Sequence, residues 1–203
     1  MIQGLDHVVF VTLDLDATVA GYRNRGFIVT PGGEHAGGVS YNTLIGFGDG
    51  SYLEIFAFHD LEKAKAANHS WAPVAERGGG WADFALRSDD LEGDVAALGP
   101  LVARPPEDGG RTRPDGMRIG WKVARLEKPL PFLIQDTTAR ENRVPQGAAT
   151  RHRDGTKRVE RIVIGATDPA GLRKKYEVLA TRGAPPVEFM KSGRDSLNLV
   201  LLG

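Results

Sequence analysis

The chain has 203 residues, of which 41% are hydrophobic, and its 26 Lys and Arg balance its 26 Asp and Glu to give zero net charge. This length suits one compact unit or two small ones, and the neutral balance excludes nucleic acid and an anionic membrane as expected partners. The sequence has no cysteine, no basic segment followed by a long apolar one at its N-terminus, and no apolar run near the ~20 residues of a membrane helix. These features predict a soluble, cytoplasmic protein without disulfides.

Residues 1–58 predict a first β-α-β-β-β module. The apolar and β-branched run over residues 5–12 is typical of a buried strand. Asp14 is a candidate N-cap for a helix that ends near Gly26. A short strand and a Gly-rich loop follow in "GFIVTPGGEHAGG", and "SYNTLIGFGDGSYLEIFAF" predicts a hairpin whose turn is "GDG" at residues 48–50.

Residues 59–80 predict a connector that begins as a helix and ends in three glycines. The first pattern then returns in "WADFALRSDDLEGDVAAL", where Asp90 stands 76 positions after Asp14. Strands are predicted in "LVARP", "MRIGWKVARL" and "PLPFLIQD", so residues 81–136 form a second β-α-β-β-β module. Such a repeat indicates duplicated units that bury one another's apolar faces.

Residues 137–158 are polar and irregular, which predicts a linker, and residues 159–203 predict a partial third unit. Asp168 before Pro169 is a strong helix start, because proline loses no needed hydrogen bond at the first helical position. The order of this unit is β-α-β-β, one strand short. Its strands are too apolar to remain exposed, so they either pack beside the first two modules or complete a sheet in a second subunit. The second arrangement favours a homodimer.

His7 and Glu54 are polar residues in strands that are otherwise apolar. Because side chains alternate along a strand, His7 shares one face with two valines, and a cavity or another layer must meet that face. Glu54 lies between Tyr52 and Phe56 on one face of its strand. An unpaired buried charge is costly, so Glu54 should form an ion pair, bind a metal or stay protonated.

The repeat relates Asp83 to His7, because the offset that aligns the helix caps superposes these two positions. A pseudo-twofold arrangement of the modules would bring His7, Glu54 and Asp83 toward one centre. Imidazole and carboxylate groups suit a divalent ion such as Zn, Mn, Fe or Ni. The alternatives are a hydrogen-bonded His7–Glu54 pair in a cavity wall and a salt bridge from Asp83 to Arg87 or another base. Arg87 is also a candidate for bidentate contact with an anionic substrate group.

Further candidates lie near the Gly-rich loop and on the second module. His35 is predicted to line the cavity mouth as an acid/base group or hydrogen-bond donor, the alternative being a surface histidine of an ordinary hairpin. For the two tryptophans of the second module, core packing and ligand contact are both open. The candidate substrate-binding residues are Asn42, Tyr52, Phe56, Trp81, Arg87 and Trp121.

The sequence resembles the vicinal oxygen chelate superfamily, the glyoxalase, bleomycin-resistance and extradiol-dioxygenase group. The segments that carry the resemblance are "LDHVVF" at the start of the first module and "YLEI" at its end. His35, Gly37 and Asn42 ahead of the hairpin, together with "LPFLIQD", are similar to the glyoxalase-like domain branch. The resemblance covers residues 1–138 and the tail more loosely. It implies an α+β fold in which repeated β-α-β-β-β modules with curved mixed sheets enclose a cavity.

In that superfamily the metal ligands come from the first and last strands of each module. His7 and Glu54 match the two positions of the first module, and Asp83 stands where a histidine or glutamine is usual. Gln135 and Asp136 are the polar residues nearest the position of a second glutamate, so three of four ligands are matched at most. The resemblance implies a lyase, isomerase or oxygenase whose metal acts as a Lewis acid on a small molecule with two vicinal oxygens.

Two other functions remain open. A metal-free binding protein of the bleomycin-resistance kind would hold a flat or aromatic ligand with Tyr52, Phe56 and the two tryptophans. The unmatched fourth ligand favours that function, whereas the joint presence of His7, Glu54 and Asp83 favours the enzyme. A structural or regulatory module with the same fold is the third, since a fold does not determine chemistry.

Overall fold

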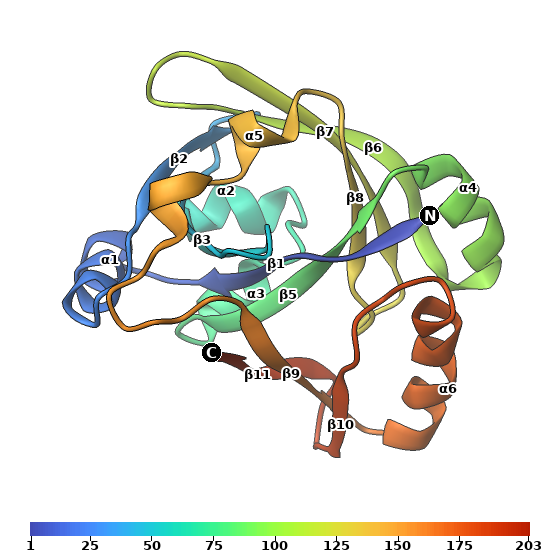
Figure 1. Ribbon diagram of the computed structural model, residues 1–203. Helices are drawn as coiled ribbons and strands as arrows, with labels where there is room; N and C mark the ends of the chain where they lie inside the picture. The colour runs from blue at the N-terminus through green and yellow to red at the C-terminus, as the bar shows by residue number, and fades with distance from the viewer.

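The fold is a closed barrel with a smaller sheet beside it, and the computed structural model describes residues 1–203 apart from the side chain of Leu199. Eight strands close the barrel in the order β1-β4-β3-β2-β6-β7-β8-β5 (Figure 1). Their bounds are β1 Ile2–Val11, β2 Thr30–His35, β3 Ser40–Gly46, β4 Tyr52–Phe58, β5 Gly80–Ser88, β6 Val102–Thr112, β7 Arg118–Leu126 and β8 Phe132–Asp136. Each module supplies four strands, and the modules meet at the antiparallel pairs β1–β5 and β2–β6. The predicted fold class is confirmed.

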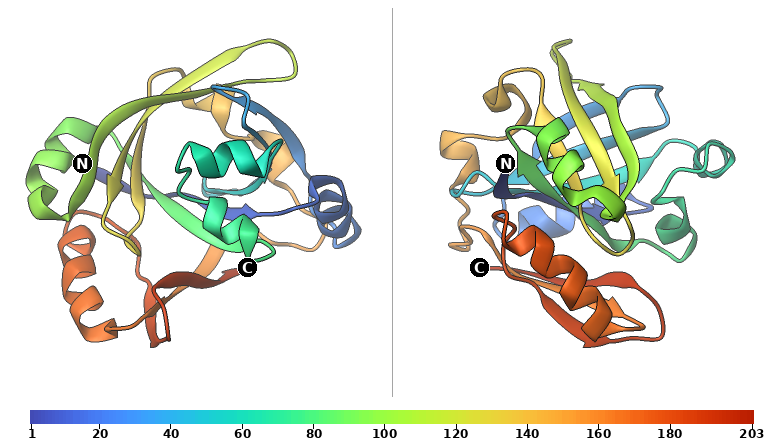
Figure 2. Two further views of the ribbon diagram at one scale, coloured as in Figure 1. Left: turned by 180° about the vertical axis from the view of Figure 1, so that it is seen from behind. Right: turned by 90° about the vertical axis from the view of Figure 1, so that its right-hand side faces the viewer.

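Helices flank the barrel and lie near both of its ends. In Figures 1 and 2, α1 and α4 lie on opposite sides, α2 and α3 lie toward one end, and α5 lies toward the other. The α-helices are α1 Leu15–Asn24, α2 Leu61–Ala66, α3 Ala72–Glu76, α4 Leu91–Leu98, α5 Arg140–Arg143 and α6 Pro169–Ala180, with 3-10 turns η1 Gly99–Leu101 and η2 Gly147–Thr150.

The three helix caps predicted from the repeat are confirmed. The side chains of Asp14, Asp90 and Asp168 each accept a hydrogen bond from the backbone N–H three residues on, at 2.9, 3.0 and 3.0 Å. Each carboxylate satisfies an N–H group that the first turn leaves free and lies at the positive end of the helix. The predicted β3–β4 hairpin is also present.

Strand alternation divides the buried residues into two layers. Outward residues such as Val8 and Leu86 pack in the main core, which also holds residues of α1, α4 and the third unit. Inward residues such as Val9, Val11 and Ala85 form a second apolar cluster. His7 shares the inward face with Val9 and Val11, so it faces the interior of the barrel, as its strand position predicts.

The third unit is a three-stranded sheet, ordered β10-β9-β11, with α6. Its strands are β9 Val159–Ala166, β10 Glu188–Lys191 and β11 Ser196–Leu202, and with α6 the order along the chain is β-α-β-β. Ile162 and Ile164 belong to the same core as the outward residues of the barrel, so this unit packs beside the first two modules (Figure 2). Arg182 donates to the buried carboxylate of Asp94 at 2.8 Å and joins the unit to α4. A homodimer stays a prediction.

The segment between the barrel and the third sheet is anchored to the first module by a buried histidine. The Nδ1 of His152 accepts from the backbone N–H of Ile28 at 3.1 Å, and its Nε2 lies 2.8 Å from the carbonyl oxygen of Gly46.

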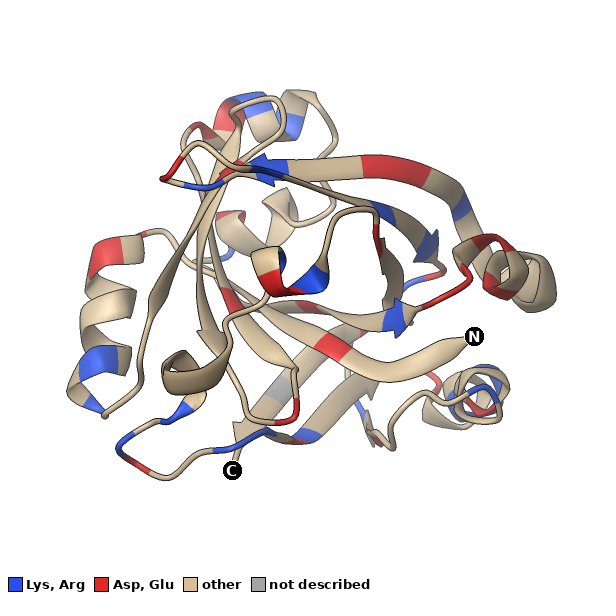
Figure 3. Ribbon diagram, turned by 45° about the horizontal axis from the view of Figure 1, so that its top comes forward, with Lys and Arg blue, Asp and Glu red and all other residues tan. Residues whose placement is uncertain are grey.

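Acidic and basic residues lie interspersed over the fold (Figure 3). Among the described residues, no helix is long and apolar enough to cross a membrane.

Candidate functional site

The barrel encloses a cavity of about 580 Å³, within the usual range for small-molecule sites. Three inward-facing residues of β4 line the cavity at alternate positions, namely Tyr52, Glu54 and Phe56. Residues from the α2–α3 connection and Arg143 of α5 also line the cavity, so it extends between the two ends of the barrel. The cavity therefore changes from polar to aromatic along β4.

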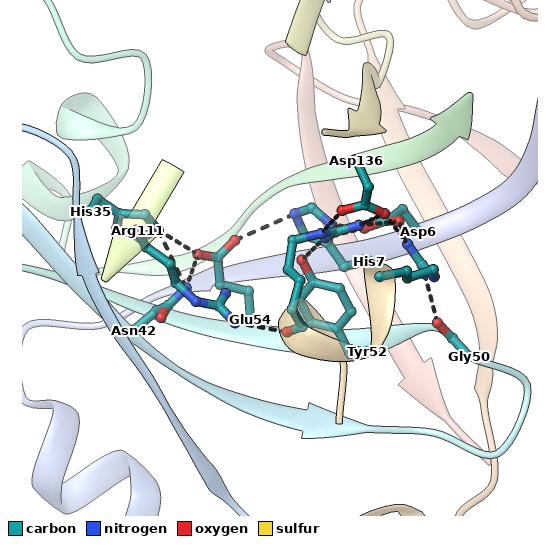
Figure 4. A network of polar contacts seen from close by, with 11 residues as sticks. Asp6, His7, His35, Asn42, Gly50, Tyr52, Glu54, Arg111 and Asp136 are labelled. Carbon is teal, nitrogen blue, oxygen red and sulfur yellow. Dashed lines mark hydrogen bonds and ion pairs between the residues drawn. The ribbon is translucent and has the colours of Figure 1, made fainter. Parts of the chain in front are cut away.

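Glu54 lies at the centre of the polar part (Figure 4). Its Oε2 lies 3.4 Å from Nε2 of His7, and its Oε1 lies 3.4 Å from Nε2 of His35. Asn42 donates to Oε1 at 2.6 Å. These four residues come from β1, β2, β3 and β4, and their inward positions bring them together. His35 and Asn42, both candidates from the sequence, lie on the cavity wall.

A glycine in β2 makes room for Asn42. A Cβ on Gly32 would lie 1.9 Å from Oδ1 of Asn42, so a side chain at this position would displace the amide. On the far side of the cluster, Nδ1 of His35 lies 3.0 Å from the hydroxyl oxygen of Ser40. The "PGG" of the Gly-rich segment thus lets two strands approach closely around the amide that contacts Glu54.

Behind His7 lies a buried ion-pair network. The Nδ1 of His7 is 2.6 Å from Asp6, and Arg143 donates to both carboxylate oxygens of Asp6 at 2.9 Å. Arg143 also contacts Asp136 and donates to the hydroxyl of Tyr52 at 2.6 Å, and Arg140 pairs with Asp6. Figure 4 shows the network beside the Glu54 cluster. Because Asp6 and Arg143 are fully buried, each needs the other for charge compensation.

The network shifts the pKa values of its members. Burial alone would raise the pKa of Glu54, but hydrogen bonds and charge from His35 and His7 outweigh it and hold the pKa well below its ordinary value. Burial would lower the pKa of His7, but Asp6 and Glu54 raise it above 6.5. His7 is therefore favoured as a cation between two carboxylates, and Glu54 as an anion.

Arg111 adds a buried guanidinium to the cavity wall. It lies on β6 and donates through one terminal nitrogen to the backbone carbonyl of Arg143 at 2.7 Å. Its Nε is buried without a hydrogen-bond partner among the described residues. Burial, the largest influence, lowers the pKa of Arg111, although Tyr52 and Glu54 oppose it.

Aromatic residues line the rest of the cavity. The ring of Phe56 stacks on His35 at 5.3 Å between centroids and meets Trp71 edge-on at 4.8 Å. Trp121 meets His35 edge-on at 6.4 Å. Burial, with a smaller effect from nearby Arg125 and His35, lowers the pKa of His69 to about 4. This part of the site suits a flat apolar group and disfavours an added positive charge.

Three of the predicted site residues lie away from this cluster. Asp83 contacts Lys128 and accepts from the indole N–H of Trp71 at 3.1 Å. Trp81 packs edge-on against Phe10 at 5.1 Å, on the outward side of β1. Arg87 donates to the backbone carbonyl of Gln3 at 3.2 Å, beside the third unit. The structure thus places Asn42, Tyr52, Phe56 and Trp121 on the cavity wall, but not these three.

The donor arrangement does not fit the three-ligand metal site expected from the sequence. In the described part of the chain, no group of three or more His, Asp or Glu side chains could hold a metal ion. Asp83 is bonded to Lys128 and Trp71, and Oε1 of Glu54 accepts from Asn42. His7 and Glu54 are left as a pair of donors that face each other.

Sequence reasoning missed Asp6, Arg111 and Arg143. Asp6 had a signal, because it adjoins His7 in a strand that is otherwise apolar. Arg111 and Arg143 had none, since both lie in polar segments where an arginine is expected on the surface. Gln135 and Asp136, singled out near the unmatched ligand position, have structural partners: Gln135 accepts from the N–H of Leu91 at 3.0 Å, and Asp136 pairs with Arg143.

Comparison with solved structures found several chains that are similar to this one. A hypothetical protein from Staphylococcus aureus aligns over 100% of this chain and 91% of its own, with a TM-score of 0.78 and 13% identity. A hypothetical protein from Bacillus halodurans aligns over 66% of this chain and 95% of its own, with a TM-score of 0.50 and 15% identity. A Streptomyces coelicolor methylmalonyl-CoA epimerase, solved with 2-nitronate-propionyl-CoA, covers 68% of this chain and 100% of its own, with a TM-score of 0.47 and 22% identity.

Two β-α-β-β-β modules closed around a cavity define the fold of the vicinal oxygen chelate superfamily. Among curated proteins, none matches the chain. The sequence profile of the glyoxalase-like domain family matches residues 5–180, and the chain belongs to that family. The predicted membership is confirmed, and the match extends from the barrel into α6 of the third unit.

Proposed function

We propose that the protein binds a small oxygenated molecule in the barrel cavity and transfers protons on it with His35, assisted by His7 and Glu54. The observation that carries this proposal is one buried carboxylate facing two imidazole Nε2 atoms, at 3.4 Å each, on the wall of a cavity of about 580 Å³. Ionisable groups with shifted pKa values in a cavity are typical of acid–base sites.

Each residue has a distinct role in this proposal. His7, held as a cation by Asp6 and Glu54, places a positive charge in the cavity wall that stabilises a ligand oxygen as it gains negative charge. His35, which also contacts Ser40, takes a proton from the ligand or returns one. Glu54 fixes both imidazoles and stays ionised. The reaction class is enolisation next to a carbonyl group, the step shared by isomerases and lyases.

The test is hydrogen exchange next to a carbonyl. The protein is incubated in D₂O with hydroxyacetone, pyruvate or phenylpyruvate, and loss of the C–H signal is followed by proton NMR. We expect exchange with at least one compound and a rate about 100-fold lower in Glu54→Gln, because Glu54 positions both imidazoles and a positioned acid–base group contributes about that factor or more. Glu34→Gln is the matched control, since Glu34 pairs with His59 and lies outside the cavity lining.

Two outcomes would contradict this proposal. If Glu54→Gln exchanges the proton as fast as the unmodified protein, the Glu54 cluster does not perform the transfer. If the compounds bind without any exchange, the function is ligand binding alone, the alternative of the bleomycin-resistance kind.

A divalent metal held by His7 and Glu54 is the second candidate. The observation that favours it is the 2.6 Å contact between Asp6 and Nδ1 of His7, because a carboxylate commonly orients a metal-binding imidazole in this way. Elemental analysis of protein purified without chelator or affinity metal tests it. Near one equivalent of Zn, Mn, Fe or Ni, lost in His7→Ala, is expected for this candidate. Absence of metal, with no uptake on adding these ions, would reject it.

A further inference from the structure

Arg111 is a buried cation that forms no direct ion pair with a carboxylate of the described residues. Only 5% of its surface is exposed, and it lines the cavity. Its hydrogen bond to the carbonyl of Arg143 is to a neutral group, and its Nε has no partner among the described residues. Arg143 differs, because it is bonded to Asp6 and Asp136. An uncompensated buried charge is costly, which indicates a partner from outside the chain.

The nearby carboxylate of Glu54 is already engaged. Its two oxygens face Asn42, His35 and His7, and the ion pairs of the described residues do not join it to Arg111. Arginine remains charged in proteins even when burial lowers its pKa. The guanidinium therefore stays available for an anion that enters the cavity.

The other cations of the cavity are placed differently. Lys128 and Arg125 both lie near the carboxylate of Asp83, at the end of the cavity where Trp71 lies. Between that end and Arg111 the wall is apolar, formed by the rings of Phe56 and Trp121 and by aliphatic residues of β7 and β8. Arg104, which also lines the cavity, is exposed. Among the described residues, Arg111 is therefore the one buried arginine of the cavity wall without an ion pair, and it lies beside an aromatic wall.

We infer that the ligand of the proposed site is a small carboxylate with an apolar, aromatic body. Its carboxylate pairs with Arg111, whose planar guanidinium matches that group, and its body lies against Phe56 and Trp121. The inference rests on the proposed function, because it concerns the same cavity. A phosphate dianion fits less well, since a single free guanidinium would face it and the negative charge of Glu54 lies nearby.

Binding of a matched pair of probes tests the inference. Isothermal titration calorimetry compares phenylacetate with phenylacetamide, which has the same shape without the charge. We expect phenylacetate to bind the unmodified protein about 10- to 100-fold more tightly, the usual contribution of a charge-assisted hydrogen bond. The preference should disappear in Arg111→Met and persist in Arg118→Met, which removes an exposed arginine from the adjacent strand β7.

Four results would overturn the inference: equal affinities for the two probes, no binding of either, a preference that persists in Arg111→Met, or displacement of phenylacetate by an equal concentration of inorganic phosphate. If Arg111→Met does not fold, the affinities of the unmodified protein for phenylacetate and phenylacetamide still test the inference. The exchange of hydroxyacetone tests the proposed function independently of the carboxylate inference, because hydroxyacetone has no carboxylate to pair with Arg111. If that exchange depends on Glu54 while the probes bind equally, only the carboxylate inference fails.

Discussion

Replacing Asp6 with asparagine is expected to destabilise the protein by about 3–5 kcal/mol, the range for breaking a buried ion pair. Asp6 is fully buried and accepts from Arg143 through both carboxylate oxygens, while it also contacts His7 and Arg140. The variant leaves the guanidinium of Arg143 in the protein interior with less compensating charge. Urea unfolding at neutral pH, followed by circular dichroism, measures the change in the free energy of unfolding.

Asp115→Asn is the matched control for this variant. Asp115 also pairs with an arginine, Arg113, but 51% of its side chain is exposed, so its loss should cost no more than about 1 kcal/mol. Adding Arg143→Met to Asp6→Asn should restore part of the lost stability, because the guanidinium that Asp6 compensates is then removed from the interior as well. A free energy of unfolding for Asp6→Asn within about 1 kcal/mol of the unmodified protein would contradict this description of the network.

Local patterns were sufficient to predict the elements of the fold. Caps at Asp14, Asp90 and Asp168 depend on interactions three residues apart, and the alternation of Val8 with Val9 depends on strand geometry alone. Closure of the barrel is different, because the β2–β6 pair joins residues from separate modules. No local pattern encodes such a pairing, and here the resemblance to a known superfamily supplied the expectation of an enclosed cavity.

The same division applies to the site. His7, Glu54, His35 and Asn42 meet because each occupies an inward position of its strand, which alternation can predict. Asp83 also belongs to an inward face, but the ladder between β1 and β5 is antiparallel and pairs Asp83 with Val9 and His7 with Ala85. His7 and Asp83, which the sequence repeat relates to each other, therefore do not lie opposite each other in the β1–β5 pair. Asp83 is bonded to Lys128 and Trp71 and takes no part in the Glu54 cluster.

The ion-pair network required tertiary structure. Asp6 and His7 are neighbours in one strand and would normally point to opposite faces, yet they are in contact. The register of β1 against β5 shifts between Leu5 and His7, so regular alternation is interrupted at Asp6. Arg143 reaches this point from a segment whose composition predicts a linker. The segment that contains α5 folds back over the end of the barrel, and the composition of this segment does not predict its contact with β1.

The imidazole of His7 is expected to titrate above 6.5, its ordinary pKa. Burial opposes this shift, but Asp6 at 2.6 Å and Glu54 at 3.4 Å both favour the charged ring. NMR titration of the ring signals, assigned with His7→Gln, measures the pKa. Glu54→Gln should lower it, because one of the two adjacent negative charges is then lost. A pKa at or below 6.5 in the unmodified protein would contradict the prediction.

The raised pKa of His7 also makes its contribution to stability depend on pH. The folded state binds this proton more tightly than the unfolded state, so the contribution is fully present below pH 6.5 and is lost as pH rises through the folded pKa. A tenfold tighter hold on the proton in the folded state corresponds to about 1.4 kcal/mol of stability. Unfolding measured from pH 5 upward should therefore show the stability difference between the unmodified protein and His7→Gln decreasing above pH 6.5. A difference that stays constant with pH would mean that His7 is neutral in the fold, leaving its Nε2 without the charge assigned to it in the proton transfer.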